Sequence, residues 1–218
     1  MARDLCLQCQ RPTKACICAF ICKIDNKTPV LVLQHPSEVK QSKGTVALLQ
    51  RSLNACQVIV GEDFSENSEV NNILAKHHAL LLYPSEQAKE LSLVIGNLKQ
   101  KHAEIKHHKP LLLIILDGTW KKAYRMYMLS KNLQPLISVC LPDYLANNGQ
   151  YLIRKVAKKN ALSSLEATCY ALALLEDELN YLTKTPNKNL QVVDCGFYQP
   201  LLNKFVQFNQ FHFSFRNF

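Results

Sequence analysis

Short runs of apolar residues alternate with helix-like stretches along the chain, and this alternation constrains the fold more than any other feature. The apolar runs are Val30–Leu33, Cys56–Val60, Ala79–Tyr83, Leu111–Leu116 and Ile137–Leu141. The helix-like stretches are Thr45–Leu53, Glu86–Lys101, Thr119–Lys131 and Ser164–Tyr181. Several runs are apolar on both faces, as in the buried strands of a parallel sheet. We therefore expect an α/β fold with a largely parallel sheet flanked by helices.

The composition is that of a folded protein and gives no sign of a membrane span. Hydrophobic residues make up 48% of the 218 and charged residues 20%. The longest apolar runs are far shorter than the roughly 20 residues that cross a bilayer. The first ten residues, MARDLCLQCQ, lack the apolar centre of a signal peptide. We expect a soluble, cytoplasmic protein without a membrane partner.

Positive charge is in excess and unevenly placed. Lys and Arg outnumber Asp and Glu by 26 to 17, giving a formal net charge of +9. Such an excess favours a polyanionic partner, although many basic proteins bind no nucleic acid. Basic clusters fall at 99–109, at 121–125 and at 154–159. A solvated helix face explains the first best, whereas the third precedes a predicted helix, where a phosphate contact is the better explanation.

Cysteines are concentrated at the start of the chain. Four of them form the pattern C-x2-C-x6-C-x-C: Cys6, Cys9, Cys16 and Cys18. Closely spaced pairs can place four thiolates around a tetrahedral zinc ion, which forms a closed structural site. Disulfides are disfavoured in a reducing cytosol, and scattered core cysteines would not cluster in this way. We predict a zinc-binding segment over residues 1–24, with Cys22 as a possible substitute ligand, and a second domain over 25–218.

Loops that follow the predicted strands are the expected place for a ligand, because α/β folds bind ligands at the carboxyl ends of their strands. The candidate loops are Gln34–Glu38, Tyr83–Glu86, Asp117–Trp120 and Tyr151–Glu166. The dinucleotide signature GxGxxG and the phosphate loop GxxxxGK[ST] are both missing from the sequence. Nucleotide chemistry of those two kinds is therefore disfavoured.

The residues after Leu111–Leu116 allow both a structural and a functional interpretation. Asp117 could end the strand and cap the next helix, or it could be a catalytic carboxylate. Trp120 begins an apolar stripe at helical spacing, which favours a core anchor, but a ligand contact would also place it there. The pattern alone does not decide either case.

Two further motifs carry the same ambiguity. Ser163 and Glu166 fit a capping box, in which each side chain satisfies an N–H group at the start of a helix, although those N–H groups could also face a ligand. His35 suits a turn or a contact with ligand or RNA. Tyr83-Pro84 suits a turn that leaves an aromatic ring free to stack.

Taken together, the motifs resemble those of the DTW-domain family, whose members are tRNA-uridine aminocarboxypropyltransferases related to the SPOUT class of S-adenosylmethionine (SAM) enzymes. The matching elements are C-x2-C-x-R-P with C-x-C at Cys6–Cys18, LQHPSE at Leu33–Glu38, LLYP at Leu81–Pro84, LDGTW at Leu116–Trp120, and YLIRK followed by LSSLEA at Tyr151–Ala167. The sequence departs from the family pattern at Gly44-Thr45 and at Ser163-Ser164. The resemblance implies a SPOUT-like domain with a knotted C-terminal half.

The resemblance also implies a reaction. A 3-amino-3-carboxypropyl group would pass from SAM to N3 of a tRNA uridine, with release of methylthioadenosine. N3 carries a proton that a positioned base would help to remove, and Asp117 is the candidate base. The sulfonium is already a good leaving group, so orientation of N3 is the main remaining task and no metal is required there.

Ligand contacts follow from the same resemblance. The residues expected to bind SAM are Tyr83, Pro84, Leu116, Gly118, Thr119, Trp120, Leu162, Ser163, Ser164, Glu166 and Ala167. The residues expected to contact tRNA are Arg11, Lys14, His35, Glu38, Lys121, Lys122, Arg125, Arg154, Lys155 and Lys158. The alternatives are a SAM-dependent RNA methyltransferase on the same scaffold and a non-catalytic zinc protein that binds RNA. The sequence leaves open whether the protein is a monomer or a homodimer.

Overall fold

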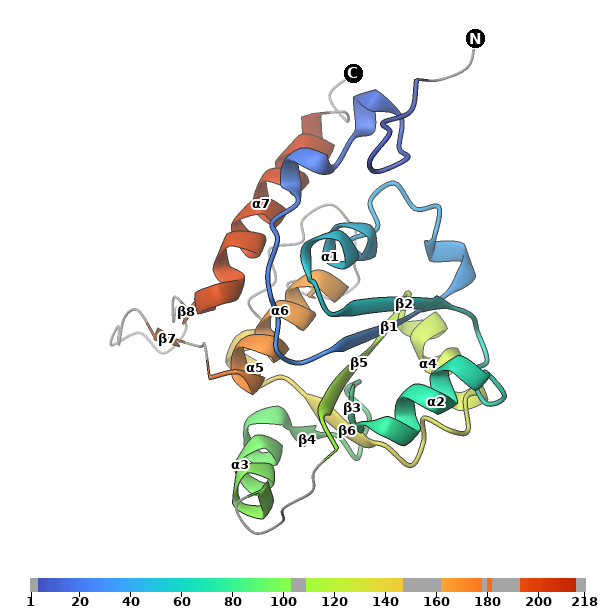
Figure 1. Ribbon diagram of the computed structural model, residues 1–218, viewed down its shortest axis with the longest axis vertical. Coiled ribbons are helices and arrows are strands. Elements are labelled where there is room, and N and C mark those ends of the chain that lie inside the picture. Colours follow the sequence, from blue (N-terminus) through green and yellow to red (C-terminus); the bar gives the residue numbers. More distant parts are fainter. Residues whose placement is uncertain (1–3, 103–108, 147–161, 178–179, 182–192, 215–218) are drawn as a thin grey trace.

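The computed structural model describes residues 4–102, 109–146, 162–177, 180–181 and 193–214. Its centre is a six-stranded sheet of order β2-β1-β5-β3-β6-β4, in which every neighbouring pair is parallel (Figure 1). The strands are β1 (Val30–Gln34), β2 (Cys56–Val60), β3 (His78–Leu82), β4 (Lys89–Glu90), β5 (Leu111–Asp117) and β6 (Ile137–Cys140). The predicted α/β fold with a parallel sheet is confirmed.

Helices cover both faces of the sheet. They are α1 (Val46–Ser52), α2 (Ser68–Lys76), α3 (Leu91–His102), α4 (Trp120–Leu129), α5 (Asp143–Ala146), α6 (Ser164–Leu175) and α7 (Gln199–Ser214). Buried residues of α1, α3, α6 and α7 form one hydrophobic cluster with one face of the sheet. Those of α2 and α4 form a second cluster with the other face. Among the helices that the structure describes, none combines the length and apolar character of a membrane span.

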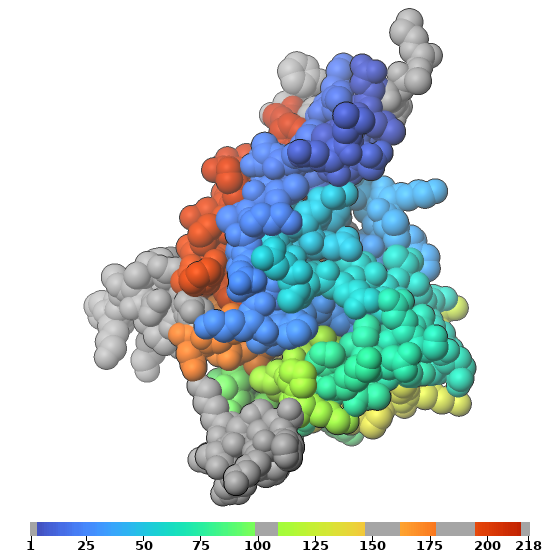
Figure 2. All heavy atoms as spheres, viewed as in Figure 1, coloured from blue at the N-terminus to red at the C-terminus, as the bar shows by residue number. Residues whose placement is uncertain are grey.

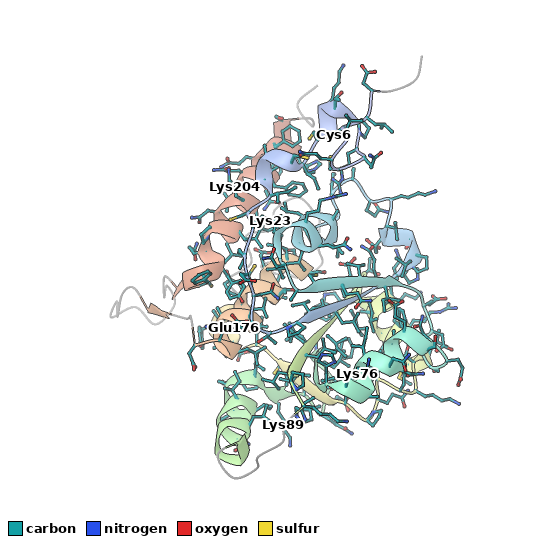
Figure 3. All side chains as sticks on the ribbon, in the orientation of Figure 1. Cys6, Lys23, Lys76, Lys89, Glu176 and Lys204 are labelled. Carbon is teal, nitrogen blue, oxygen red and sulfur yellow. The ribbon has the colours of Figure 1, made fainter. Side chains whose placement is uncertain are left out.

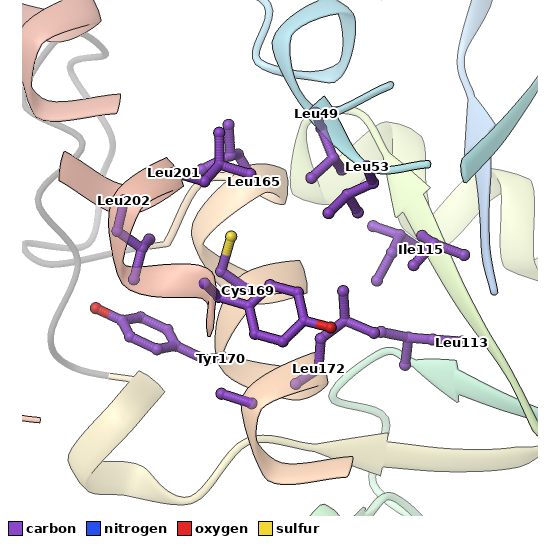
Figure 4. Packing of buried hydrophobic residues seen from close by; sticks show 14 of the residues in the cluster. Leu49, Leu53, Leu113, Ile115, Leu165, Cys169, Tyr170, Leu172, Leu201 and Leu202 are labelled. Carbon is purple, nitrogen blue, oxygen red and sulfur yellow. The ribbon is translucent and has the colours of Figure 1, made fainter. Parts of the chain in front are cut away.

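The two clusters follow from strand geometry, because successive side chains of a strand point to opposite faces. On β5, Leu113 and Ile115 join the cluster that contains α6, while Leu112 and Ile114 join the cluster that contains α4. Figure 4 shows the first group, with Leu113 and Ile115 lying between the sheet and the side chains of α1 and α6. Burial on both faces explains why the run LLLIIL has no polar position.

The pattern of apolar residues misses α2. This nine-residue helix has a short apolar stripe, in which Val70 is buried and Ile73 and Leu74 are partly buried, and its other residues are mostly polar. A better signal is Asn67, whose side chain accepts a hydrogen bond from the N–H of Val70 at 3.0 Å and caps the helix. The short elements β4 and α5 are likewise absent from the expected pattern.

Helix α6 ends earlier than the expected Tyr181. Its last residue is Leu175, and Asp177 shortly afterwards has a φ of 57°, in the left-handed region that does not continue a right-handed helix. Tyr181 instead belongs to β7 (Asn180–Tyr181), which pairs antiparallel with β8 (Val193–Asp194).

The cysteine-rich segment lies against the last helix. Its second short 3-10 helix, Cys18–Phe20, places the ring of Phe20 5.8 Å from that of Phe208 and 5.3 Å from that of Phe211, both on α7. Figure 1 and the space-filling view in Figure 2 show the segment (dark blue) beside α7 (red) at one end of the molecule. Helix α7, which contains the Phe-rich stretch Asn203–Ser214, therefore packs on α6 and on this segment.

Candidate active site

The carboxyl ends of β1 and β5 form a switch point in the sheet. The two strands are neighbours, yet the chain passes from β1 to α1 on one face and from β5 to α4 on the other. In open α/β sheets, ligands bind in the crevice outside the carboxyl ends of two such strands. Gln34 and Asp117, the last residues of these strands, are paired in register there.

Asp117 is buried at this point and is held by two donors. Its Oδ2 accepts a hydrogen bond from Nε2 of Gln34 at 2.9 Å, and its Oδ1 accepts one from Oγ of Ser164 at 2.5 Å. The carboxylate is thus fixed by β1, β5 and the start of α6. Each carboxylate oxygen has room for about two acceptor contacts, so both can still accept a proton or a further hydrogen bond.

The start of α4 is capped by Thr119 and not by Asp117. The hydroxyl of Thr119 accepts a hydrogen bond from the N–H of Lys122 at 3.4 Å. Helix capping therefore does not explain the carboxylate at position 117. Gly118 lies between the two residues, and a Cβ added there would be 3.0 Å from Cβ of Lys122 and 3.7 Å from Cβ of His35. A side chain at 118 would crowd Lys122 in the first turn of α4 and would only touch His35, so glycine fits the close approach of this loop to α4.

The start of α6 is a capping box, as the sequence predicts. The hydroxyl of Ser163 accepts a hydrogen bond from the N–H of Glu166 at 3.2 Å, and Oε2 of Glu166 accepts one from the N–H of Ser163 at 2.8 Å. Both side chains are buried. The box fixes the first turn of α6 and so positions Ser164 against Asp117.

Replacing Ser163 with alanine is expected to destabilise the fold by about 1 kcal/mol, because a buried cap is lost. For a chain of this size, that change lowers the melting temperature by about 2–4 °C. Thermal or urea unfolding measures it, with Ser42→Ala, an exposed serine outside the cap, as the control. A melting temperature equal to that of the control would contradict the structural importance of the box.

A chain of charged groups connects the loop after β1 to α4. Glu38 is only 4% exposed, and its Oε1 lies 2.7 Å from Nζ of Lys122. Oε1 of Glu62 lies 2.9 Å from Nε of Arg125 and 3.2 Å from Nε2 of His35. These pairs fix the loops around the switch point, and they bring together four of the residues expected to contact tRNA: His35 and Glu38 in the LQHPSE motif, and Lys122 and Arg125 on α4.

The imidazole of His35 is oriented by its own loop. Its Nδ1 accepts a hydrogen bond from the N–H of Ser37 at 3.2 Å, which assigns the ring proton to Nε2. Nε2 then donates to Glu62. The turn interpretation of His35 is therefore supported. The main chain of His35 also lies beside Asp117, since the N–H of His35 bonds to the carbonyl of Asp117 at 2.9 Å.

Tyr83 follows β3, the other neighbour of β5, and its ring stacks on that of Tyr127 in α4 at 5.1 Å. Burial raises the pKa of the Tyr83 hydroxyl, and the nearby phenols of Tyr124 and Tyr127 raise it further. The stacked pair of Tyr83 and Tyr127 therefore connects the loop after β3 to α4. Pro84, the next residue, is exposed.

The other residues expected to bind SAM have different degrees of burial. Leu116 is buried in the α4 cluster. Leu162 and Ala167 are partly buried against the cluster that contains α6. Trp120 is 58% exposed, so the interpretation of this residue as a core anchor is wrong. The buried face of α4 is formed instead by Ala123 and Met126.

The four N-terminal cysteines converge as their spacing predicts. Their sulfur atoms all lie within 4.8 Å of one another, with Sγ of Cys6 3.7 Å from that of Cys18 and Sγ of Cys9 3.8 Å from that of Cys16. Zinc–sulfur bonds of about 2.3 Å in a tetrahedron separate sulfurs by about 3.8 Å, so the set fits such an ion. Backbone N–H groups of Cys9 and Gln8 lower the pKa of the Cys6 thiol to about 6, which favours the thiolate.

Cys22 is not part of this group of four cysteines. The group lies at the end of the molecule near the tip of α7, where Figure 3 labels Cys6. Close by, Nη1 of Arg11 donates to the carbonyl of Ser42 at 2.9 Å, and Lys14 is exposed. The third basic cluster, which contains Arg154, Lys155 and Lys158, lies outside the described residues.

A family model for the DTW domain matches residues 3–213, nearly the whole chain. The chain belongs to the DTW-domain family. No solved structure matches it.

Curated relatives of this DTW domain carry closely related names. A tRNA-uridine aminocarboxypropyltransferase 2 of Macaca fascicularis is 31% identical over 201 residues, which cover 89% of this chain and 63% of the relative. The Drosophila melanogaster protein of the same name is 31% identical over 80% of this chain and 67% of its own length. An Arabidopsis thaliana tRNA-uridine aminocarboxypropyltransferase A is 26% identical over 81% and 74%. The chain thus spans under two thirds of the Macaca protein's length.

The sequence assigns no role to two residues that position the site in this DTW domain. They are Gln34, which donates to Asp117, and Glu62, which links His35 to Arg125. Gln34 had a usable signal, because a polar side chain that ends a buried strand faces the same edge as Asp117. Glu62 had none, because only the placement of β2 beside β1 brings its loop to His35.

Proposed function

We propose that this DTW domain transfers the 3-amino-3-carboxypropyl group of SAM to N3 of a uridine in tRNA. The observation that carries the proposal is the buried carboxylate of Asp117, held by Gln34 and Ser164 at the switch point of the sheet. The names of the curated relatives support the same reaction. The fold would be of the SPOUT class, with a knot in its C-terminal half.

The proposed step requires one proton transfer and one substitution. Asp117 takes the proton of N3, and the N3 electron pair forms a bond to the methylene carbon next to sulfur. The carbon–sulfur bond breaks, its electron pair stays on sulfur, and methylthioadenosine leaves. Because the sulfonium needs no further activation, the protein acts by removing the proton and by aligning N3 with the carbon–sulfur bond.

The substrates would reach Asp117 from the loops around it. We assign SAM to the turn after β3, to the loop from Leu116 to Thr119 and to the start of α6 from Leu162 to Ala167. We assign tRNA to the exposed cations Lys121 and Arg125, to His35 and, at the cysteine-rich segment, to Arg11 and Lys14. Glu38 is buried and Lys122 is partly exposed; they neutralise each other in this ion pair, so they serve chiefly to hold the loop.

The cysteine group would hold one zinc ion through Cys6, Cys9, Cys16 and Cys18. Four sulfur ligands leave no open coordination position, so the ion would supply structure and no catalytic chemistry. Its role would be to order a segment too short to fold around a core of its own.

Product analysis tests the proposed reaction. The purified protein is incubated with SAM and unmodified tRNA, and the small-molecule product is identified by mass spectrometry. Methylthioadenosine together with a uridine that gains an aminocarboxypropyl group is the expected result. S-adenosylhomocysteine and a methylated nucleoside would show the methyltransferase instead, and the absence of both products would support a protein that only binds RNA.

A further inference from the structure

Helix α4 carries a row of exposed apolar side chains. Trp120, Tyr124 and Met128 are 58%, 57% and 50% exposed. They are spaced four residues apart, so they line one side of the helix. This side faces away from the sheet, because the buried face of α4 is formed by Ala123 and Met126.

The row brings three exposed large side chains together on one face of one helix, whereas several aromatic side chains of the described residues are buried. Phe64, Tyr198, Phe205 and Phe208 are completely buried. Adjacent exposed aromatic and apolar side chains at helical spacing mark an interaction site more often than isolated exposed residues do. Tyr127, three residues after Tyr124 on the same helix, stacks on Tyr83 at 5.1 Å, so an aromatic contact next to the row links α4 to the loop after β3.

A second row, of positive charge, runs beside the first. Lys121 and Arg125 are exposed, and their four-residue spacing places them on the neighbouring strip of α4. Arg125 pairs with Glu62 through Nε, yet its side chain is 66% exposed. Lys121 forms no ion pair among the residues that the structure describes. An aromatic row next to a cationic row is the arrangement by which proteins bind single-stranded nucleic acid, with bases on the rings and phosphates on the cations.

We propose that the α4 row, formed by Trp120, Tyr124 and Met128, binds unpaired nucleotides of the RNA next to the target uridine. The inference rests on the proposed function and assigns to α4 the contact with the nucleotides that flank the reacting uridine. Trp120 is only three residues beyond Asp117, so a base stacked on the indole is a close neighbour of the reacting one. A paired stem could not supply such contacts, because its base faces are already stacked on one another.

Intrinsic fluorescence tests this directly, because Trp120 is the only tryptophan of the chain. The full-length protein is titrated with a mixed-sequence single strand of about ten nucleotides, within the usual site size, and with the same strand annealed to its complement. The single strand is expected to quench Trp120 and the duplex to bind more weakly. Tyr124→Ala is expected to weaken binding of the single strand roughly 5- to 100-fold, the usual effect of losing one stacked base.

A matched control is available on another surface. Phe197, in the short helix Gly196–Tyr198, is 63% exposed, and Phe197→Ala should leave the affinity for RNA unchanged. Trp120→Ala is followed with a fluorescently labelled strand, and far-UV circular dichroism verifies that each variant is folded.

Three outcomes would overturn the inference. They are equal affinity for strand and duplex, quenching of Trp120 by SAM alone with none by RNA, and conversion of a dimer into a monomer by Trp120→Ala in sedimentation. The first would indicate a general basic surface, the second a SAM contact and the third a contact between two copies. Failure of the proposed reaction would be seen in a different measurement, as the absence of methylthioadenosine. That result would not change the quenching of Trp120 by RNA, so the two failures can be distinguished.

Discussion

Asp117→Asn is expected to lower the rate of aminocarboxypropyl transfer by about 100-fold or more, the usual contribution of a positioned general base. Asparagine has nearly the same shape as aspartate, and its oxygen can keep the hydrogen bond from Ser164. The amide of Gln34 can turn to present its oxygen to the new NH2 group, so the fold should survive. Single-turnover formation of methylthioadenosine measures the rate, and tRNA binding should be unchanged.

Asp25→Asn is the matched control. Asp25 is exposed and accepts a hydrogen bond from Asn54 at 3.3 Å, near the amino ends of β1 and β2 and away from the switch point. This variant should keep the full rate. If Asp117→Asn also transferred the group at the normal rate, Asp117 would not be the base. If it lost tRNA binding as well as activity, its role would be structural.

Cys9→Ser is expected to remove the metal and unfold the cysteine-rich segment. The sulfur of Cys9 is one corner of a four-sulfur group, and three sulfurs with a hydroxyl bind zinc far more weakly. Structural zinc sites supply much of the folding free energy of short segments, about 10–16 kcal/mol of apparent binding in zinc-finger peptides. Metal analysis should therefore give about one zinc per chain for the parent protein and none for the variant.

Cys22→Ser is the control within the same segment. Cys22 lies outside the four-sulfur group and packs against the main core, so this variant should keep its zinc. Limited proteolysis gives a second readout, because the segment of Cys9→Ser should be cleaved faster while the sheet stays resistant. The zinc site would be contradicted if the parent protein contained no metal and its cysteine-rich segment were as resistant to the protease as the sheet.

Local features could be predicted from the sequence because the residues that form each of them lie close together along the chain. The capping box needs only Ser163 and Glu166, three positions apart. The cysteine group needs two short spacings, and the run LLLIIL needs only burial on both faces. The causes are a free N–H group for the capping box, a tetrahedral ion for the cysteines and burial on two faces for the strand. Each of them requires particular residue types at nearby positions of the sequence.

Contacts between distant segments could not be derived in this way. The bond between Gln34 and Asp117 depends on the register of β1 against β5, across 83 positions of the chain. The ion pair of Glu38 with Lys122 depends on the same juxtaposition. A single sequence indicates which segments form apolar strands but not which strand is the neighbour of which, since one apolar strand fits another about equally well.

The sequence by itself determined the α/β class, the cysteine cluster and the position of Asp117 after a buried strand. Only the tertiary structure decided which face of α4 the sheet covers. Helical spacing allowed Trp120 to lie in the core, but the sheet packs on Ala123 and Met126, and the indole remains in solvent. The reason is physical: periodicity defines the relative directions of side chains around a helix, whereas the rotation of the helix about its axis is set by what it packs against.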